Sequence, residues 1–306
     1  MFSSQSKIYP LRTLAILSLI GAAFGCTVLT MNTRLLDQGF EPATQVYVRI
    51  LLGFGLSLLA FRKKLRIKHL ITIPKKDIFL LLIMGSVGCA SAILFLTLAA
   101  LNTKIVNVAV IESTVPFVVY FYSYLFFKEK VRPKLLFSLL LTVYGSSVVA
   151  TKSFAPTLKI VGTGELFAIF AVFSLGWWSI GRKMLSDHLN NKEITVITML
   201  IAGLTSLVIA LLKKEPFSPQ AFTLPSVIVG IIIGSGLNLV ITYLEAFAFK
   251  NINLVFGNQL LMTHIVFSLI GGILFYQEFI SLPEFFGGFI VLASVWQANK
   301  LIKTEV

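Results

Sequence analysis

Stretches of apolar residues without a single charge follow one another along the chain, separated by short polar connections. A helix of about 20 apolar residues is long enough to cross the ~30 Å hydrocarbon core of a bilayer. Eight such stretches contain no Asp, Glu, Lys or Arg, and two more contain one charge each, Arg49 and Glu112. The pattern therefore predicts ten membrane-spanning helices, over residues 13–33, 43–61, 78–103, 105–127, 135–151, 166–181, 194–212, 216–244, 251–277 and 285–299.

The composition of the 306-residue chain agrees with this pattern. Hydrophobic residues make up 57% of it and charged residues only 13%, whereas soluble domains carry about 25% charged residues. So few polar residues cannot cover the surface of a water-soluble fold, and ten spans leave no room for a separate soluble domain. We therefore expect an all-α membrane protein with ten transmembrane helices.

Basic residues are concentrated in alternate connections. A net charge of +13 would suggest nucleic-acid binding in a soluble chain, but here the Lys and Arg residues lie between apolar stretches. Nineteen of the 26 fall on the side of the membrane that holds both termini, six fall on the other side, and Arg49 lies within a span. Because cytoplasmic connections are enriched in Lys and Arg, we predict a multi-pass protein of the cytoplasmic (inner) membrane with both termini in the cytoplasm and no nucleic-acid partner.

The residues that could bind a metal or cofactor are scattered. Cys26 and Cys89 lie in different apolar stretches, which argues against a disulfide scaffold or a Cys-rich metal site. His69 and His188 lie in predicted connections, and no His, Cys or carboxylate spacing typical of a zinc site accompanies His264. We expect no metal and no cofactor.

An internal repeat divides the chain into two halves. Residues 126–137 (FFKEKVRPKLLF) align with residues 275–286 (FYQEFISLPEFF) at an offset of 149, which places Glu129 opposite Glu278. The first copy contains basic residues and the second contains none. Because each half has five spans, an odd number, the second half must cross the membrane in the opposite sense. The sequence predicts two inverted five-helix repeats, residues 1–155 and 156–306, an arrangement common in secondary transporters.

Three segments carry a resemblance to a known family, residues 48–53 (VRILLG), 99–130 and 164–178. They resemble the corresponding segments of the EamA-type transporters of the drug/metabolite transporter superfamily. At the family's usual proline position in the ninth span this chain has Ile265, preceded by His264. The resemblance covers essentially the whole chain and implies a fold of two five-helix repeats and a transport function.

Ionisable residues inside the predicted spans are candidate site residues, because an ionised side chain at the bilayer centre costs at least about 2.5–3.5 kcal/mol. Glu112 is followed by Pro116 and Tyr120 at i+4 and i+8, so a continuous helix would carry all three on one face. We expect this face to line a cavity. The alternative is a carboxylate held by Arg49 or by a neighbouring helix.

Arg49 and one face of the eighth span are further candidates. Arg49 could clamp the second span to a neighbour through a carboxylate or backbone carbonyls, which is the preferred interpretation, or it could contact substrate. Asn238, Thr242 and Glu245 recur at i, i+4 and i+7 on one face. Glu245 lies five residues before Lys250, so it belongs either to a cavity or to a solvated helix end.

The ninth span is unusually polar at mid-depth, with Asn258, Gln259 and His264. A buried histidine can be a hydrogen-bonded structural residue, and because it titrates near neutral pH it can also serve a proton-coupled step. Both roles are open for His264.

Trp177 and Trp178 lie deeper in the sixth span than the aromatic belts at membrane surfaces. Adjacent helical residues diverge by about 100°, so at least one of the two should point inward. The predicted substrate-binding residues are Glu112, Tyr120, Trp177, Trp178, Asn258 and His264, with Arg49, Asn238, Thr242, Glu245 and Gln259 in a second group.

These features predict a secondary transporter that moves small polar or amphiphilic metabolites, such as amino acids or amines, outward by alternating access. The acidic candidates favour an amino or quaternary ammonium group, Arg49 would suit a carboxylate, and a zwitterion would satisfy both. The alternatives are an importer or exchanger of a cationic or nucleoside-like metabolite, a drug efflux protein and a passive channel. An intramembrane enzyme is disfavoured, since the sequence has neither a G-x-S-x-G elbow nor an H-E-x-x-H pair. The expected partners are a small-molecule substrate and the lipid bilayer, with proton coupling as an open question.

Overall fold

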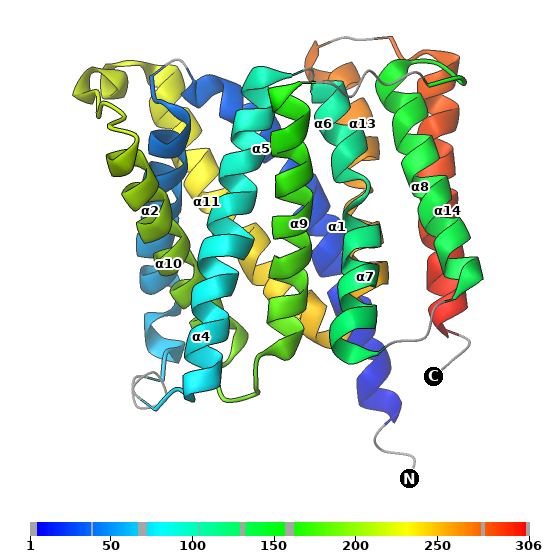
Figure 1. Cartoon of the computed structure of the whole chain (residues 1–306), viewed down its shortest axis with the longest axis horizontal. Coiled ribbons are helices and arrows are strands. Elements are labelled where there is room, and N and C mark those ends of the chain that lie inside the picture. The colour runs from blue at the N-terminus through cyan, green and yellow to red at the C-terminus, as the bar shows by residue number, and fades with distance from the viewer. Residues whose placement is uncertain are drawn as a thin grey trace.

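The computed structural model describes residues 5–37, 39–66, 72–103, 105–128, 132–156, 162–276 and 279–303, which form helices and connections without a strand. Ten helical spans in this part of the chain are long and apolar enough to cross a membrane, as predicted. Figure 1 shows the beginning of α1 (Gln5–Leu36) and the end of α14 (Leu282–Lys303) at the same end of the bundle, called here the terminus end. The opposite end is called the far end.

Each repeat contributes five spans, and several of these spans consist of more than one helical segment. The first repeat contains α1, α2 (Pro42–Phe61) with η1 (Arg62–Lys64), a third span of α4 (Lys75–Ile83), the π-helical η2 (Met84–Ala90) and α5 (Ser91–Asn102), a fourth of α6 (Ile105–Glu112) and α7 (Val115–Phe127), and α8 (Pro133–Thr151). The second contains α9 (Thr163–Met184), α10 (Asn191–Leu212), η3 (Pro219–Thr223), α11 (Pro225–Asn251), a ninth span of α12 (Leu254–Leu261) and α13 (His264–Tyr276), and α14.

The eighth span begins and ends later than the sequence pattern predicted. It runs from Pro225 to Asn251 rather than over residues 216–244. Proline breaks a helix interior because it cannot donate a backbone hydrogen bond. Pro216 and Pro219 therefore lie in a connection that contains η3, and Pro225 takes the first turn of α11, where no N–H is needed.

The helices pair across the two repeats. α1 packs along α11, and their repeat counterparts, α9 in the second repeat and α5 in the first, pack along each other. Two further pairs, α2 with α10 and α8 with α14, join equivalent spans of the two repeats. Because the most extensive helix pairs all join one repeat to the other, the repeats form one interlocked bundle and not two separate domains.

The α8–α14 pair stands at one edge of the bundle (Figure 1) and meets at two glycines. A Cβ atom built on Gly145 would lie 2.8 Å from the carbonyl oxygen of Gly287, and one built on Gly287 would lie 2.8 Å from the carbonyl oxygen of Gly145. Small residues allow this close approach of backbones, as they do in other transmembrane helix pairs.

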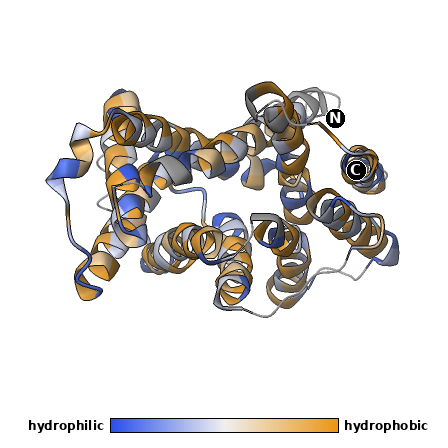
Figure 2. Cartoon of the chain, turned by 90° about the horizontal axis from the view of Figure 1, so that it is seen from above, coloured by the Kyte–Doolittle hydropathy of each residue, from blue (hydrophilic) through white to orange (hydrophobic). Residues whose placement is uncertain are grey.

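The outer surface of the bundle is apolar. Viewed from above, the helices are coloured mainly as hydrophobic (Figure 2), and exposed side chains include Leu59, Leu212 and Leu274. A water-soluble monomer rarely exposes contiguous apolar surface of this extent. The described residues thus form a multi-pass membrane protein whose apolar belt faces lipid.

The inverted arrangement requires the connections after α7 and after α13 to lie on opposite membrane faces. Glu129 and Glu278 lie outside the described residues, but α8 begins at the terminus end and α14 begins at the far end (Figure 1). We expect cysteines placed singly at the exposed positions Lys134 and Phe279 to react with an impermeant thiol reagent from opposite sides. The background is Cys26→Ser, Cys89→Ser, and labelling of both sites from the same side would contradict the inverted repeat.

Candidate functional site

The fourth span is interrupted in its middle, although the sequence pattern predicted one continuous helix. α6 ends at Glu112 and α7 begins at Val115, with a turn at Ser113 and Thr114. Pro116 has no N–H to donate to the carbonyl of Glu112, four residues earlier, so the regular helix cannot continue. The hydroxyls of Ser113 and Thr114 each donate a hydrogen bond of 2.6 Å to the carbonyl three residues before them. The interruption leaves Glu112 as the last residue of α6.

The ninth span is interrupted at the matching position. α12 ends at Leu261, which the offset of 149 aligns with Glu112, and α13 begins at His264. This span has no proline at the break. Instead the Thr263 hydroxyl donates to the carbonyl of Leu260 at 2.8 Å, and His264 Nδ1 lies 3.0 Å from the carbonyl oxygen of Leu261. The two matching interruptions confirm that the fourth and ninth spans are repeat counterparts.

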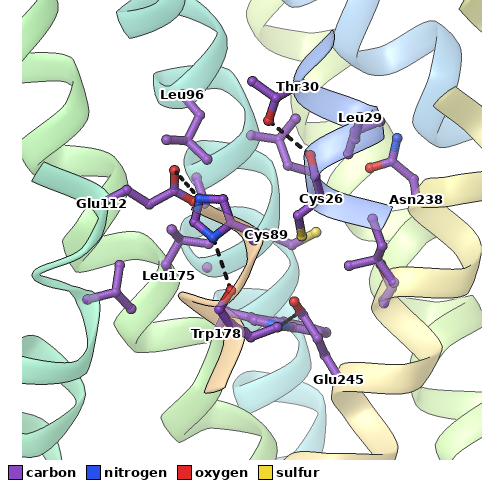
Figure 3. A pocket seen from close by; sticks show the side chains of 18 of the residues that line it. Cys26, Leu29, Thr30, Cys89, Leu96, Glu112, Leu175, Trp178, Asn238 and Glu245 are labelled. Atoms are coloured by element: carbon purple, nitrogen blue, oxygen red, sulfur yellow. Dashed lines mark hydrogen bonds and ion pairs between the residues drawn. The ribbon is translucent and has the colours of Figure 1, made fainter. Parts of the chain in front are cut away.

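A cavity of about 180 Å³ lies beside these interruptions, between the two repeats. Its wall comes from α1, α2, η2, α5, α6, α7, α9, α11, α12 and α13, so both repeats contribute. Most of the wall is apolar, and Figure 3 shows Glu112, Trp178 and Glu245 around the same space. Eight of the predicted site residues line it: Arg49, Glu112, Trp178, Asn238, Thr242, Glu245, Asn258 and His264.

Two side-chain contacts organise the acidic groups of the cavity. His264 Nε2 lies 3.9 Å from Glu112 Oε2, so the interrupted spans meet through an imidazole and a carboxylate. Trp178 Nε1 donates a hydrogen bond of 2.7 Å to Glu245 Oε2. Glu245 therefore belongs to the cavity and not to a solvated helix end.

Arg49 lies on the same wall without a carboxylate partner. The residue is 2% exposed. Its Nη1 and Nη2 atoms donate to the hydroxyls of Thr33 at 3.3 Å and Thr97 at 3.4 Å, and its Nε atom has no hydrogen-bond partner. Arg49 forms no ion pair with any described residue, and the neighbour of Glu112 is His264. The interpretation in which Arg49 holds Glu112 is therefore wrong.

Tyr120 and Trp177 lie outside the cavity wall. The hydroxyl oxygen of Tyr120 accepts a hydrogen bond of 2.6 Å from the backbone N–H of Arg132. Because the turn at residues 113–114 interrupts the helix, Tyr120 does not share a face with Glu112. Trp177 packs edge-on against Tyr122 and Phe126 of α7, so Trp178 is the member of the pair that faces the cavity.

Gln259 also lies outside the cavity wall, in a buried polar network. Its Nε2 atom donates to the hydroxyls of Ser138 at 2.9 Å and Thr142 at 2.8 Å, both on α8. The Thr142 hydroxyl lies 2.7 Å from the hydroxyl of Ser294 on α14. This network ties the ninth span to the α8–α14 pair, and Gln259 does not reach the cavity.

Sequence reasoning missed the small hydroxyl residues of the site. Thr33 and Thr97 hold Arg49, and Ser179 donates a hydrogen bond of 3.0 Å to Asn258 Oδ1. A single Ser or Thr within an apolar helix usually bonds to a carbonyl of its own helix. Such residues therefore carry no distinctive signal in a sequence.

Polar contacts join helices and connections at the terminus end of the bundle. Lys250 Nζ lies 2.5 Å from Asp187 Oδ1, and Arg66 Nη2 lies 2.8 Å from Glu193 Oε2. The hydrogen bond from Lys250 lowers the pKa of Asp187, which lies outside the spans. Arg182 donates a 2.8 Å hydrogen bond to a backbone carbonyl of α11. None of these residues lines the cavity, whose wall reaches Thr33 on α1 and Ala100 on α5, toward the far ends of these helices.

Comparison with known proteins identifies the family. The model of the EamA-like transporter family matches residues 13–151 and again residues 162–299. The chain belongs to the EamA-like transporter family. This result confirms the resemblance seen in the sequence and identifies the chain as a transporter of the drug/metabolite type.

One relative and one solved structure extend the comparison of this EamA-like transporter. The uncharacterized transporter YetK of Bacillus subtilis (strain 168) is 27% identical over 161 residues, which are 51% of this chain and 47% of YetK. The alignment thus spans about half the length of that relative. A crystal structure described only as that of a protein shares the fold, with a TM-score of 0.74 over 95% of this chain and 97% of the other, at 13% identity.

The ninth span of this EamA-like transporter has no proline at its interruption, and we expect it to tolerate one at residue 265. Residue 265 lies in the first turn of α13, where proline is accepted, and α7 carries Pro116 in the equivalent place. We expect Ile265→Pro to lower the free energy of unfolding by about 1 kcal/mol, the worth of the one backbone hydrogen bond that it removes. Leu269→Pro, in the interior of α13, should cost roughly 3 kcal/mol or more. Thermal unfolding of the purified variants measures both, and an equal loss would contradict the interruption at residues 262–263.

Proposed function

We propose that this chain is a secondary transporter that moves small polar or amphiphilic metabolites, such as amino acids or amines, outward across the cytoplasmic membrane by alternating access. The observation that carries the proposal is the cavity between the two repeats, bordered by two interrupted helices and lined by ionisable side chains. In transporters built from inverted repeats, substrates bind near the midplane at the repeat interface, at interrupted helices. An apolar wall with a few polar groups fits a small amphiphilic molecule.

The polar contacts at the terminus end support a cycle in which this end is closed and the cavity is open to the outside in the present conformation. The distribution of Lys and Arg supports a cytoplasmic terminus end, and the pairs Asp187–Lys250 and Arg66–Glu193 join helices and connections at that end. Because the repeats are inverted, an exchange of their conformations would open the cytoplasmic end and close the far end. The interruptions of the fourth and ninth spans provide joints for this movement.

The contact between Glu112 and His264 favours coupling of transport to protons. The two side chains come from the two interrupted spans and lie 3.9 Å apart on the cavity wall. Histidine changes charge near neutral pH. A substrate ammonium that reaches Glu112 would compete with the protonated imidazole, so substrate binding and protonation of His264 would be linked.

Replacing the charge of Glu112 should impair transport without unfolding the protein. We expect Glu112→Gln to lower the rate of counterflow roughly tenfold, because one charge-assisted hydrogen bond is worth about 1.5 kcal/mol or more. The measurement uses proteoliposomes loaded with mixed amino acids and amines. Glu41→Gln, at an exposed carboxylate, is the matched control and should transport normally.

The same assay separates the proposal from its alternatives. A passive channel would give no counterflow, and an intramembrane enzyme would convert the loaded compound into a product. Normal transport by a well-folded Glu112→Gln variant would remove Glu112 from the mechanism.

The fluorescence of the two adjacent tryptophans should respond differently to the binding of substrate. Trp178 lines the cavity, whereas Trp177 packs against α7. We expect a transported compound to quench or shift tryptophan fluorescence in the wild type and in Trp177→Phe, and to leave it unchanged in Trp178→Phe. A response that disappears with Trp177 and persists without Trp178 would place the substrate outside this cavity.

A further inference from the structure

Four basic residues come together at the terminus end, where the chain leaves α2. Three of them, Arg62, Lys63 and Lys64, form η1, and their side chains are exposed. The fourth is Lys192 in the first turn of α10, and its Nζ atom lies 5.8 Å from the centre of the Phe61 ring at the end of α2. The ammonium groups of Lys64 and Lys192 interact directly with each other. These four residues are called here the basic cluster.

The described acidic residues at the terminus end are engaged with other partners. Glu193 accepts hydrogen bonds from Nε of Arg66 at 3.0 Å and from its Nη2 at 2.8 Å. Asp187 pairs with Lys250, and the Asp77 carboxylate accepts hydrogen bonds from the backbone N–H and the hydroxyl of Ser186. No member of the basic cluster forms an ion pair with a described residue. The positive charge of the cluster is therefore not neutralised within the described part of the chain.

Backbone contacts hold the two lysines of the cluster next to each other. The Asn190 side chain donates a hydrogen bond of 3.5 Å to the backbone carbonyl of Lys64 and accepts one of 2.9 Å from the backbone N–H of Lys192. The Phe61 ring packs against the ring of Tyr243 on α11, with 5.3 Å between the ring centres. Two like charges fixed in contact repel each other. An anion that bridges them would remove this repulsion.

The surface beside the cluster is apolar and faces lipid. Leu52, Leu56 and Leu59 lie at i, i+4 and i+7, so they share one face of α2, and all three are exposed. Lys63 follows Leu59 by four residues, at the terminus end of this row of leucines. A lipid whose acyl chain lies along the leucines therefore has its headgroup beside the basic cluster.

We propose that the basic cluster binds the phosphate of an anionic phospholipid in the leaflet at the terminus end, with Lys64 and Lys192 as the two main ligands. Phosphate oxygens accept hydrogen bonds from several ammonium groups at once, and lysine is a common phosphate ligand. Clusters of basic residues beside transmembrane helices are attracted to anionic lipids. The site goes beyond the proposed transport function, because none of its residues lines the cavity between the repeats.

Two lipids with the same acyl chains separate the contribution of the headgroup charge. Dioleoylphosphatidylglycerol carries one negative charge, whereas dioleoylphosphatidylcholine is zwitterionic. Binding is measured as the rise in unfolding temperature of the purified protein, in a non-ionic detergent, with lipid concentration. We expect phosphatidylglycerol to half-saturate the protein at a concentration about tenfold lower or more. The difference should shrink at high salt, because salt screens exposed charges.

Removal of the two lysines should weaken binding of the anionic lipid only. We expect the double variant Lys64→Gln, Lys192→Gln to raise the half-saturating concentration of phosphatidylglycerol roughly fivefold for each lysine, without a change for phosphatidylcholine. The matched control is the double variant Lys213→Gln, Lys214→Gln. It removes two exposed lysines that follow α10 at the far end, and we expect it to bind both lipids as the wild type does.

A soluble form of the headgroup distinguishes a membrane lipid from a soluble phosphate compound. Glycerophosphoglycerol is the headgroup of phosphatidylglycerol without its acyl chains, so it cannot pack against the leucines of α2. We expect it to leave the unfolding temperature unchanged at concentrations at which phosphatidylglycerol saturates the protein. Saturation by this compound at similar concentrations would assign the cluster to a soluble phosphate compound and overturn the lipid assignment.

Three further results would contradict the proposal. Equal binding of the two lipids to the wild type, or absence of binding, would show that the headgroup charge is not recognised. Unchanged binding of phosphatidylglycerol by the Lys64→Gln, Lys192→Gln variant would remove these lysines from the site. An equal loss in the Lys213→Gln, Lys214→Gln variant would show that only the total charge of the protein matters. If the first double variant fails to fold, the single variants Lys64→Gln and Lys192→Gln decide, with a loss of about fivefold expected in each.

Discussion

Backbone N–H and C=O groups have no water to bind in the hydrocarbon core of a membrane, so a helix cannot end there unless other groups satisfy it. Two spans of this protein nevertheless end and restart near mid-depth, at residues 113–114 and 262–263. The hydroxyls of Ser113, Thr114 and Thr263 donate hydrogen bonds to backbone carbonyls beside these turns. Both turns border the cavity. Because irregular backbone is tolerated only against protein or a cavity, the interruptions and the cavity depend on each other.

The pairing of helices across the repeats follows from the same environment. Apolar side chains gain nothing by leaving lipid for another apolar surface, so close packing and hydrogen bonds hold transmembrane helices together. Gly145 and Gly287 bring α8 and α14 into backbone contact, and Gln259 joins α12 to α8. This edge of the bundle is thus fastened to one interrupted span. A movement of that span would therefore be absorbed at its turn or transmitted to the α8–α14 pair.

Charges inside the bundle fall into two kinds. Arg182 and Glu193 are bound by carbonyls, an amide and a basic side chain at the terminus end, where they stabilise connections between helices. Arg49, Glu112, Glu245 and His264 line the cavity with fewer partners. Ionisable residues inside a membrane are costly to bury, and in other membrane proteins such residues commonly mark substrate or proton pathways.

The number of spans and the five-helix repeat, which the sequence predicted, are confirmed. Both could be predicted because each span and each repeat produces its own local pattern of hydrophobic residues and residue spacing. The inversion of the second repeat is seen in the opposite ends of the bundle at which α8 and α14 begin. The cytoplasmic location of both termini, which rests on the placement of Lys and Arg, stays a prediction. Pro116 marked the interruption of the fourth span, but the ninth span has no such signal. Its break depends on Thr263 and His264 binding carbonyls of a helix that neighbouring helices already hold in place.

Only the tertiary structure decided which side chains meet. A helix turns by about 100° per residue, so Trp178 faces the cavity while Trp177 does not. The interruption of the fourth span changes the direction of the residues that follow it, so Tyr120 does not face the cavity either. The partners of Arg49, Glu112 and Glu245 come from other spans, far away in the sequence. Sequence spacing describes the faces of one helix, whereas the partner of a buried charge is set by how several helices pack together. This packing leaves Arg49 without a carboxylate partner among the described residues.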